Sequence, residues 1–262
     1  LLLLLKIQPY LLPMKQISII IATFNAAKTL ERCLQSIISQ KQQEVELLVI
    51  DGQSNDETLT ILEQYREHID VIISEPDRGL YDAWNKGIRK SQGAWMWFIG
   101  ADDYILPQAV STYLNFIHEH SEELSGLDLI TAEEELVDLT GRKIKTIGKP
   151  FHWEECRKLM LIAHGATLHH RSLYAEFGDY DLNFPICADY EFLFRKGASI
   201  RSLHIPQTML SFAIGGAIYS WNSYIESFRI KQKYQAVSWL TNVYLFTRQV
   251  LAKILKDLRY TT

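Results

Sequence analysis

Four short apolar runs alternate with stretches of helical spacing in the first hundred residues. Ile17 to Thr23 reads ISIIIAT, a continuous and mostly β-branched run that predicts a strand buried on both faces of a parallel sheet. The other strands are predicted at 45–50, 71–74 and 95–99, and the helices between them at 29–39, 57–65 and 80–91. This alternation predicts an α/β fold with a doubly wound, mostly parallel sheet and right-handed crossovers.

The pattern changes after residue 107. A helix is predicted to about His120, strands are predicted within 128–147 around a turn at Thr140 and Gly141, and the chain is helical again from Ser220. We therefore expect one α/β domain at residues 15–220 and a helical tail at 221–262. The leucine-rich residues 1–14 are too few to span a bilayer, and we expect them to form a disordered extension.

Composition limits the class of protein. The chain has 262 residues, of which 47% are hydrophobic and 22% charged, as in a globular protein with a large core. A formal net charge of −4 argues against a general nucleic-acid binder. Three widely separated cysteines, none in a CxxC pair, favour reduced thiols in the cytoplasm over a structural zinc site.

The charge is unevenly distributed. Residues 221–262 contain seven basic and two acidic residues, a net charge of +5, whereas the rest of the chain contains 20 basic and 29 acidic residues. Apolar residues recur in this tail at near-helical spacing: Leu240, Val243, Tyr244, Val250, Leu251, Ile254 and Leu255. Two interpretations stay open, a helix packed on the domain or on a dimer partner, and an amphipathic helix on an anionic membrane surface. The second would make the chain peripheral at the inner face of the plasma membrane.

Each predicted strand of the first hundred residues ends in polar side chains. These ends are Thr23 with Asn25, Asp51, residues 75–79, and Asp102 with Asp103. Asn25 is also a candidate helix N-cap. The carboxyl ends of parallel strands lie at one edge of a sheet, where ligands bind, so we expect these groups to converge. Unpaired acids repel one another, and Mg²⁺ or Mn²⁺ prefers such oxygen ligands.

Two common phosphate-binding motifs are absent from the sequence. No GxGxxG follows the first strand and no GxxxxGK[ST] occurs anywhere. A bound diphosphate would therefore need a metal ion to neutralise its charge. The Asp102 and Asp103 pair could bind such an ion.

Taken in order, six segments resemble family 2 of the inverting glycosyltransferases, which have the GT-A fold. They run from about Ile17 to Arg195 and read ISIIIATFN, LLVIDGQSNDET, SEPDRGLYDAWNKGI, GAWMWFIGADDYILP, AHGATLHHRSLY and ADYEFLFR. The third is similar to bacterial exopolysaccharide enzymes of the colanic-acid type. The resemblance implies a GT-A catalytic domain with an acceptor-side subregion. It also implies transfer of a sugar from a nucleotide-sugar donor to a saccharide or lipid-linked saccharide acceptor.

The resemblance also implies roles for individual residues. Thr23 and Asn25 belong to the first nucleotide-contacting loop, and Asp51 contacts the base or ribose. Asp102 matches the last Asp of the DxD motif and ligates the divalent cation. Asp103 follows it as a further donor-side group or a helix cap.

Asp189 matches the catalytic base. His164 matches a histidine near the diphosphate or acceptor, and Asn85 remains from an ARN segment; both are expected to be donor-binding residues. The chain departs from the family pattern at Gly100, Trp84 and Ala188, which replace an Asp, an Arg and a Glu.

Two other functions remain open from the sequence. A nucleotidyltransferase acting on sugar phosphates also places acids and a metal at sheet ends, although ATFNAAKT lacks the glycine-rich basic loop expected there. An inactive nucleotide-sugar-binding module would have lost Asp102 or Asp189, and both are present.

Overall fold

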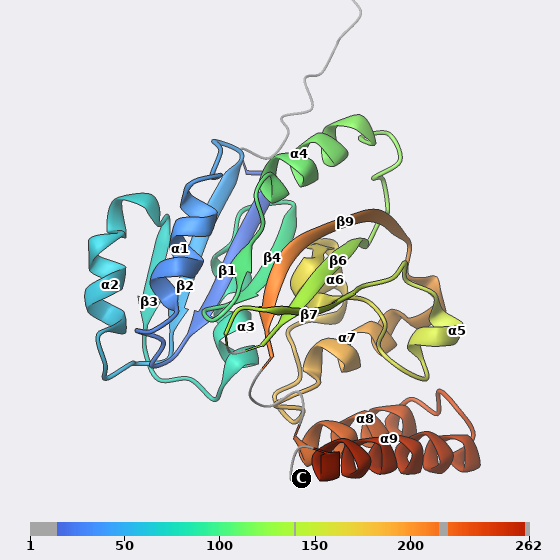
Figure 1. Ribbon diagram of the computed structural model, residues 1–262. Helices are drawn as coiled ribbons and strands as arrows, with labels where there is room; N and C mark the ends of the chain where they lie inside the picture. The colour runs from blue at the N-terminus through green and yellow to red at the C-terminus, as the bar shows by residue number, and fades with distance from the viewer. Residues whose placement is uncertain (1–14, 139, 215–219, 260–262) are drawn as a thin grey trace, which may run out of the picture.

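The computed structural model describes residues 15–138, 140–214 and 220–259, so the extension expected at 1–14 lies outside the described residues. Within them, nine strands form one sheet in the order β3-β2-β1-β4-β8-β6-β9-β5, with β7 paired to β6 (Figure 1).

The strands are β1 Ile17–Thr23, β2 Val45–Asp51, β3 Val71–Ser74, β4 Trp95–Gly100, β5 Tyr104–Ile105, β6 Leu129–Val137, β7 Lys143–Ile147, β8 Thr167–His170 and β9 Ser202–Ala213. The helices are α1 Leu30–Ile38, α2 Thr58–Gln64, α3 Leu80–Lys90, α4 Ala109–Glu119, α5 Trp153–Cys156, α6 Ser172–Phe177, α7 Ala188–Lys196, α8 Trp221–Lys233 and α9 Trp239–Arg259. Short 3₁₀ turns lie at η1 Arg66–His68, η2 His164–Ala166 and η3 Gly197–Ser199.

The first four long strands form the parallel half of the sheet, as the sequence predicts. β1 lies between β2 and β4, and β2 pairs with β3, all in parallel. The register places Thr23 beside Asp51 and Ala22 beside Gly100. The polar ends of these strands therefore lie side by side at one edge.

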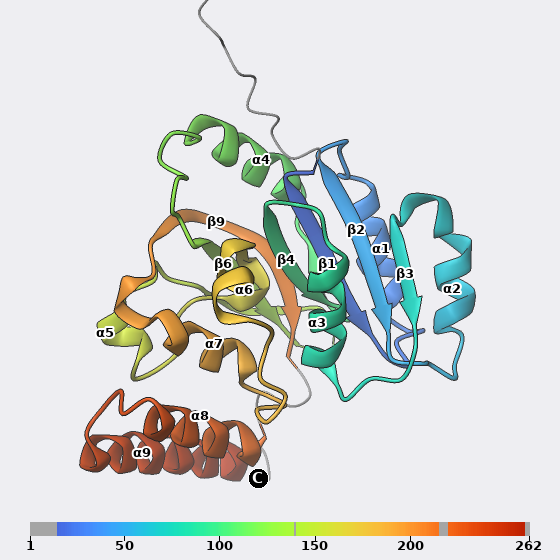
Figure 2. The ribbon, with the colours of Figure 1, turned by 180° about the vertical axis from the view of Figure 1, so that it is seen from behind.

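Both faces of β1 are buried, which explains its continuous apolar sequence. Ile19 and Ile21 pack into a core that includes residues of α1, α2 and α4. Ile20 and Ala22 pack into a second core with residues of α3, α6 and α7. The two sets of helices cover opposite faces of the sheet (Figures 1 and 2). Burying each large aliphatic side chain stabilises the fold by about 1.5–3 kcal/mol.

The other half of the sheet is mixed. β8 is antiparallel to both β4 and β6, whereas β9 is parallel to β6 and antiparallel to β5. β9 therefore joins β6 to the segment that follows β4. Tyr81 of α3 contacts Asp189 of α7, and Trp84 of α3 stacks on His164 of η2, so α7 and η2 lie beside the helix that follows the polar end of β3.

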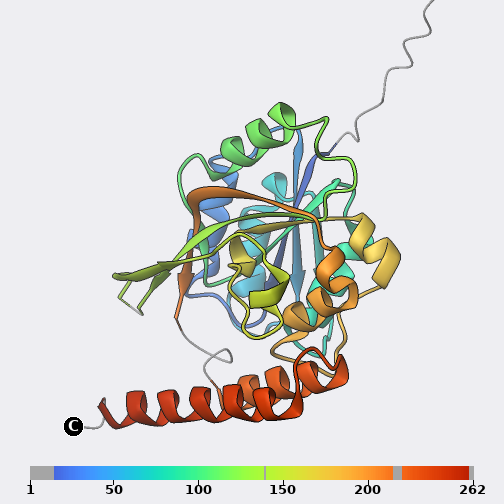
Figure 3. The same cartoon turned by 90° about the vertical axis from the view of Figure 1, so that its right-hand side faces the viewer.

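The tail forms two helices, α8 and α9, which pack together as a hairpin below α7 (Figures 1 and 3). Gln235, in the connection, has a φ of 48°, and Asn242 of α9 donates a hydrogen bond to the Phe228 carbonyl of α8 at 3.0 Å. Among the described residues, no helix combines the length and apolar character that a membrane span requires.

Candidate active site

Asp51 ends β2 and is fully buried. Its Oδ1 accepts a hydrogen bond from Ser54 Oγ at 2.5 Å. Its Oδ2 accepts from the Ser54 N–H at 3.0 Å and from Ser74 Oγ at 2.6 Å. The carboxylate is therefore fixed in one orientation and holds the loop after β2 against the end of β3.

The loop after β1 is tied to the loop after β2. Asn25 donates its backbone N–H to Ser54 Oγ at 2.8 Å, and its Oδ1 accepts from the Asn55 N–H at 2.9 Å. Asn25 has a φ of 50°, and Thr29 occupies the N-cap position of α1, so the prediction of an N-cap at Asn25 is wrong. The left-handed conformation, which Asn tolerates, turns the side chain toward the neighbouring loop instead.

Thr23 lies at the same edge. Its side chain is 4% exposed, and its Oγ1 has no hydrogen-bond partner among the described residues. A buried hydroxyl normally has a partner, so this group is suited to contact a ligand.

The two aspartates after β4 have different surroundings. Asp102 is exposed. Asp103 is buried, and its oxygens accept backbone N–H groups from Gly100 at 3.3 Å and Ala213 at 3.1 Å. Burial raises the pKa of Asp103 well above its ordinary value, and the charge of Asp102 raises it further.

Gly100, at the first position of the DxD pattern, makes room for both carboxylates. A Cβ at Gly100 would lie 2.8 Å from Asp102 Oδ1 and 2.9 Å from Asp103 Oδ2. An Asp at position 100 would therefore displace the pair.

Asp102 is the side chain best suited to ligate a cation. In the described parts of the chain, no group of three or more His, Cys, Asp or Glu residues could hold a metal ion. Mg²⁺ and Mn²⁺ sites at phosphates often use only one or two carboxylates, with the remaining ligands supplied by substrate oxygens and water. The exposed Asp102 fits such a site, whereas Asp103, engaged with backbone, would support the loop.

Asp189 lies in the first turn of α7, where a helix stabilises negative charge. Its Oδ1 accepts hydrogen bonds from the Tyr81 hydroxyl at 2.7 Å and the Tyr190 N–H at 2.8 Å. Burial raises the pKa of Tyr81 well above its ordinary value, as does the charge of Asp189, so Tyr81 stays a donor. None of the described residues donates to Oδ2, which leaves this oxygen able to accept a proton.

The remaining predicted residues, His164 and Asn85, both contact Tyr180. His164 stacks on Trp84, with ring centroids 5.2 Å apart, and its Nε2 is 3.3 Å from the Tyr180 hydroxyl. Burial lowers the pKa of His164, and the charge of Asp189 opposes this shift. Asn85 is buried and bridges the Tyr180 backbone through both amide atoms, at 3.0 and 2.8 Å. Those bonds fix the main chain of Tyr180, and the donor-binding role of Asn85 stays a prediction.

The family model of glycosyl transferase family 2 matches residues 18–199, which include all of these side chains. This chain belongs to glycosyl transferase family 2.

Relatives of this glycosyltransferase support the same family. A PGL/p-HBAD biosynthesis glycosyltransferase from Mycobacterium bovis is 32% identical over 187 residues, which cover 68% of each chain. The poly(ribitol-phosphate) beta-N-acetylglucosaminyltransferase TarS from Staphylococcus aureus is 29% identical over 116 residues, which cover 42% of this chain and 20% of TarS.

Solved structures confirm the GT-A fold. A 1–349 fragment of TarS in complex with UDP has a TM-score of 0.67 at 18% identity, covering 90% of this chain and 70% of the fragment. Mannosyltransferase PcManGT from Pyrobaculum calidifontis, in complex with GDP-Man and Mn²⁺, has a TM-score of 0.64 at 14% identity, covering 94% of this chain and 76% of that chain. Against a longer TarS structure, the match covers 39% of that chain.

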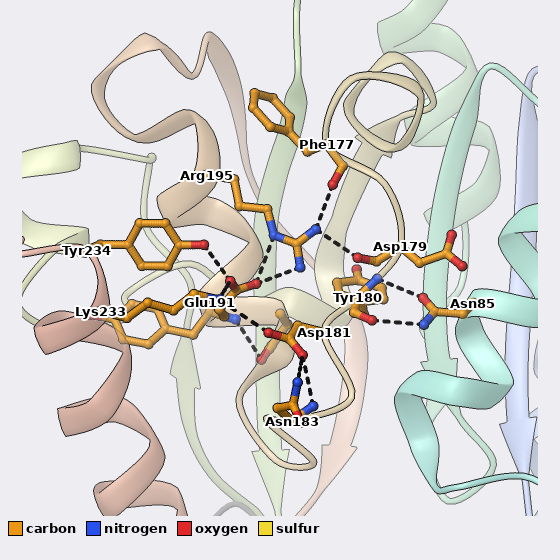
Figure 4. Close-up of polar contacts among 12 residues, drawn as sticks. Asn85, Phe177, Asp179, Tyr180, Asp181, Asn183, Glu191, Arg195, Lys233 and Tyr234 are labelled. Atoms are coloured by element: carbon orange, nitrogen blue, oxygen red, sulfur yellow. Dashed lines mark hydrogen bonds and ion pairs between the residues drawn. The ribbon is translucent and has the colours of Figure 1, made fainter.

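The glycosyltransferase domain also holds the tail through a buried carboxylate. Glu191 of α7 accepts hydrogen bonds from Arg195 at 2.7 and 2.9 Å, from Lys233 of α8 at 2.7 Å and from Tyr234 at 2.5 Å (Figure 4). Burial acts to raise the pKa of Glu191, but the hydrogen bonds from Arg195 and Lys233 outweigh burial and lower the pKa. The helix that bears Asp189 is therefore anchored to α8.

Two further residues of the site were not predicted from the sequence. Glu226 of α8 is buried, and its Oε2 accepts the backbone N–H groups of Ile186 at 3.0 Å and Cys187 at 2.8 Å, just before α7. Glu134 of β6 is 5% exposed within the run Glu133 to Glu135. Three successive acids indicate a solvated segment, so no local pattern predicts a buried carboxylate there.

Proposed function

We propose that this chain is an inverting, metal-dependent hexosyltransferase that uses a nucleotide-diphosphate-sugar in cell-surface polysaccharide or glycolipid synthesis. The geometry of Asp189 is the observation that most directly supports an active transferase. Two donors fix Oδ1, and Oδ2 is left to accept a proton.

In the proposed reaction, Asp189 Oδ2 takes the proton of the acceptor hydroxyl while the acceptor oxygen attacks the anomeric carbon. The new C–O bond forms as the bond from the anomeric carbon to the diphosphate oxygen breaks, and the nucleoside diphosphate leaves with the electron pair. One base is sufficient for this displacement, and general-base catalysis typically contributes about 10²–10⁴-fold.

The donor would bind at the carboxyl ends of β1, β2 and β4. Thr23, Asn25 and Asp51 would contact the nucleoside, and Asp102 would ligate a divalent cation. A bound cation would offset the charge of the departing diphosphate. The complexes of TarS with UDP and of PcManGT with GDP-Man and Mn²⁺ support this choice of ligands.

The other predicted residues would act around the donor. His164, kept neutral by burial, would lie near the diphosphate or acceptor. Asp103 would hold the loop of Asp102 through its two backbone contacts. Asn85 would act indirectly, by fixing Tyr180.

Release of nucleoside diphosphate from a panel of UDP- and GDP-sugars, with Mn²⁺, Mg²⁺ or a chelator, tests this proposal. We expect cation-dependent release and, by NMR of the product, an inverted anomeric configuration. Pyrophosphate release from a nucleoside triphosphate and a sugar phosphate would instead identify a nucleotidyltransferase. Donor binding without turnover under any condition would identify an inactive module.

We further propose that α9 lies on an anionic membrane surface, close to a lipid-linked acceptor. The side chains of Leu240, Tyr244, Leu251 and Leu255 are 54–74% exposed and spaced to form one stripe along the helix. Arg248 is exposed between them. Each basic residue near an anionic surface contributes about 1 kcal/mol, which suits reversible attachment in the cytoplasm.

Co-sedimentation with vesicles containing anionic lipid tests this attachment. The double variant Leu240→Gln, Leu251→Gln should lose binding, whereas Leu59→Gln, which changes an exposed leucine of α2, should not. Binding of the unchanged chain should weaken at high salt. Equal binding by the double variant would contradict the proposal. A dimer that dissociates in this variant would instead identify α9 as an interface between two copies.

A further inference from the structure

Glu134 is the inward-facing member of three consecutive acids on β6. Glu133 and Glu135 are partly exposed, and Glu135 pairs with Lys143 at 3.3 Å. Glu134 is 5% exposed, and its Oε2 has no hydrogen-bond partner among the described residues. A buried carboxyl oxygen without a partner is unfavourable and persists where a ligand or a reaction uses it.

The carboxyl group lies beside the segment of His164. A Cβ at Gly165 would lie 2.9 Å from Glu134 Oε2 and 3.0 Å from a Leu210 methyl carbon. Gly165 thus makes room for the Glu134 carboxyl group, and any larger residue would push it away. The main chain after His164 and the side chain of Glu134 form one packed unit.

Glu134 interacts electrostatically with two carboxylates, the proposed base Asp189 and Asp103 beside the proposed metal ligand. Burial raises the pKa of Glu134 to about 7; the Gly165 amide partly opposes this, and the charge of Asp189 adds to it. The charge of Glu134 in turn contributes to the raised pKa of Asp103. Glu134 is therefore close enough to interact with the proposed base and with the carboxylate beside Asp102.

The transferred sugar must lie between the proposed base and the proposed metal ligand. Its anomeric carbon is bonded to the diphosphate, near Asp102, and faces the acceptor oxygen, near Asp189. Glu134 Oε2 packs against Gly165, the residue after His164, and His164 is proposed to lie near the diphosphate or acceptor, so Glu134 borders this space. The base already has its own positioning contact in Tyr81, at 2.7 Å, so Glu134 is not needed to orient Asp189.

We propose that Glu134 Oε2 forms a hydrogen bond with a ring hydroxyl of the transferred sugar and sets the choice of donor sugar. This inference rests on the proposed function. A carboxyl group can accept a hydrogen bond from a hydroxyl when ionised and donate one when protonated. A sugar that lacks the hydroxyl leaves Oε2 buried without a partner, and such an unpaired group is a strong basis for discrimination.

The test compares the accepted donor with its monodeoxy analogues for the wild type, Glu134→Gln and Glu134→Leu. Wild type should disfavour one analogue by about 10–100-fold in kcat/KM. In Glu134→Leu, kcat/KM should fall by about 10–100-fold for the complete donor and change little for that analogue. The protein then no longer discriminates between the two donors. Glu134→Gln, which keeps an acceptor and a donor, should retain most of the selectivity. Glu135→Gln is the matched control and should behave as wild type.

Binding of the nucleoside diphosphate alone, with Mn²⁺, should be equal in all four proteins and shows that each is folded. Unchanged sugar selectivity in a folded Glu134→Leu protein would overturn the assignment. A product with retained anomeric configuration, abolished by Glu134→Gln, would also overturn it by making Glu134 a nucleophile. A wild-type chain that releases no nucleoside diphosphate from any donor would instead refute the proposed function, before any variant is compared.

Discussion

Asp51 and Glu134 are both buried carboxyl groups on the sheet, one in the parallel half and one in the mixed half, but their surroundings differ. Asp51 accepts three hydrogen bonds, from Ser54 twice and from Ser74 once. Glu134 Oε2 accepts none among the described residues, and burial raises the pKa of the group to about 7.

This difference separates two tasks. In the parallel half, the protein's own side chains satisfy the carboxylate and fix the loops after β1 and β2 before any ligand binds. In the mixed half, polar groups are buried without full compensation, which costs stability and leaves them available to a substrate. The parallel half is therefore preorganised for the nucleotide binding proposed above, whereas the mixed half contains Glu134, the group proposed to select the donor sugar.

Removal of Asp102 should have the largest effect on donor binding among the changes that probe this division. Asp102→Ala should lower turnover by roughly 10²–10³-fold or more and weaken Mn²⁺-dependent donor binding, because the diphosphate loses its cation ligand. Kinetics and calorimetry with and without Mn²⁺ measure both quantities. Glu63→Gln, an exposed carboxylate change on α2, is the control. Donor binding in Asp102→Ala with an unchanged Mn²⁺ dependence would remove Asp102 from the metal site.

Asp51→Asn should destabilise the parallel half. The amide replaces an acceptor oxygen with a donor among groups that already donate, so the free energy of unfolding should fall by about 2–3 kcal/mol. The KM for the donor should rise while kcat changes little, because the loop of Asn25 and Ser54 loosens. Denaturant unfolding at pH 8 measures the stability change. A variant as stable as wild type would show that the hydrogen bonds of Asp51 are not important for the fold.

Replacing the carboxyl group of Glu134 by an amide should instead raise the free energy of unfolding. The pKa of Glu134 is raised from an ordinary 4.5 to about 7, so the folded chain keeps a proton that the unfolded chain loses between these values. The contribution of Glu134 to the free energy of unfolding therefore falls as pH rises through this window. Glu134→Gln should be more stable than wild type by about 1–3 kcal/mol at pH 8.

The gain in the free energy of unfolding of Glu134→Gln should shrink below pH 7 and vanish near pH 4.5. Denaturant unfolding of both proteins at several pH values measures it. A constant difference across this range would mean that Glu134 does not titrate as its burial requires.

The smallest effect should come from the tail. Glu226→Ala removes the acceptor of the Ile186 and Cys187 N–H groups, which hold the segment before Asp189. We expect kcat to fall by about 3–10-fold with an unchanged donor KM, as for a small misplacement of the base. Glu226→Gln keeps an acceptor oxygen and should recover most of the activity. A rise in donor KM with a normal kcat would show that Glu226 serves the nucleotide side instead.

The parallel half could be predicted from the sequence because its signals are local. A strand that is buried on both faces needs a continuous apolar run, which Ile17 to Thr23 supplies. Parallel pairing then places Thr23, Asp51 and Asp102 at one edge without further information. The conformation of Asn25 was missed because its partner, Asn55, is distant in sequence.

The mixed half depends on contacts that sequence periodicity does not record. Glu134 lies in an acidic run, and its burial follows from the pairing of β6 with β9, about seventy residues later. Glu226 is one of two acids in a basic tail, and only the docking of α8 against α7 reveals its contact with Cys187. Apolar spacing likewise predicted a helical tail without showing where α8 ends and α9 begins.

Asp189→Asn tests most directly the central claim, that the parallel half of the sheet binds the nucleotide whereas Asp189 on α7 serves the transfer step. Calorimetric titration with the accepted donor and Mn²⁺, alongside turnover of the same preparation, gives both quantities, with Glu176→Gln on α6 as the control. We predict a donor Kd within about twofold of wild type. Turnover should be lower by about 10²–10⁴-fold. Near-normal turnover, or a loss of donor binding that matches the loss of turnover, would contradict the account.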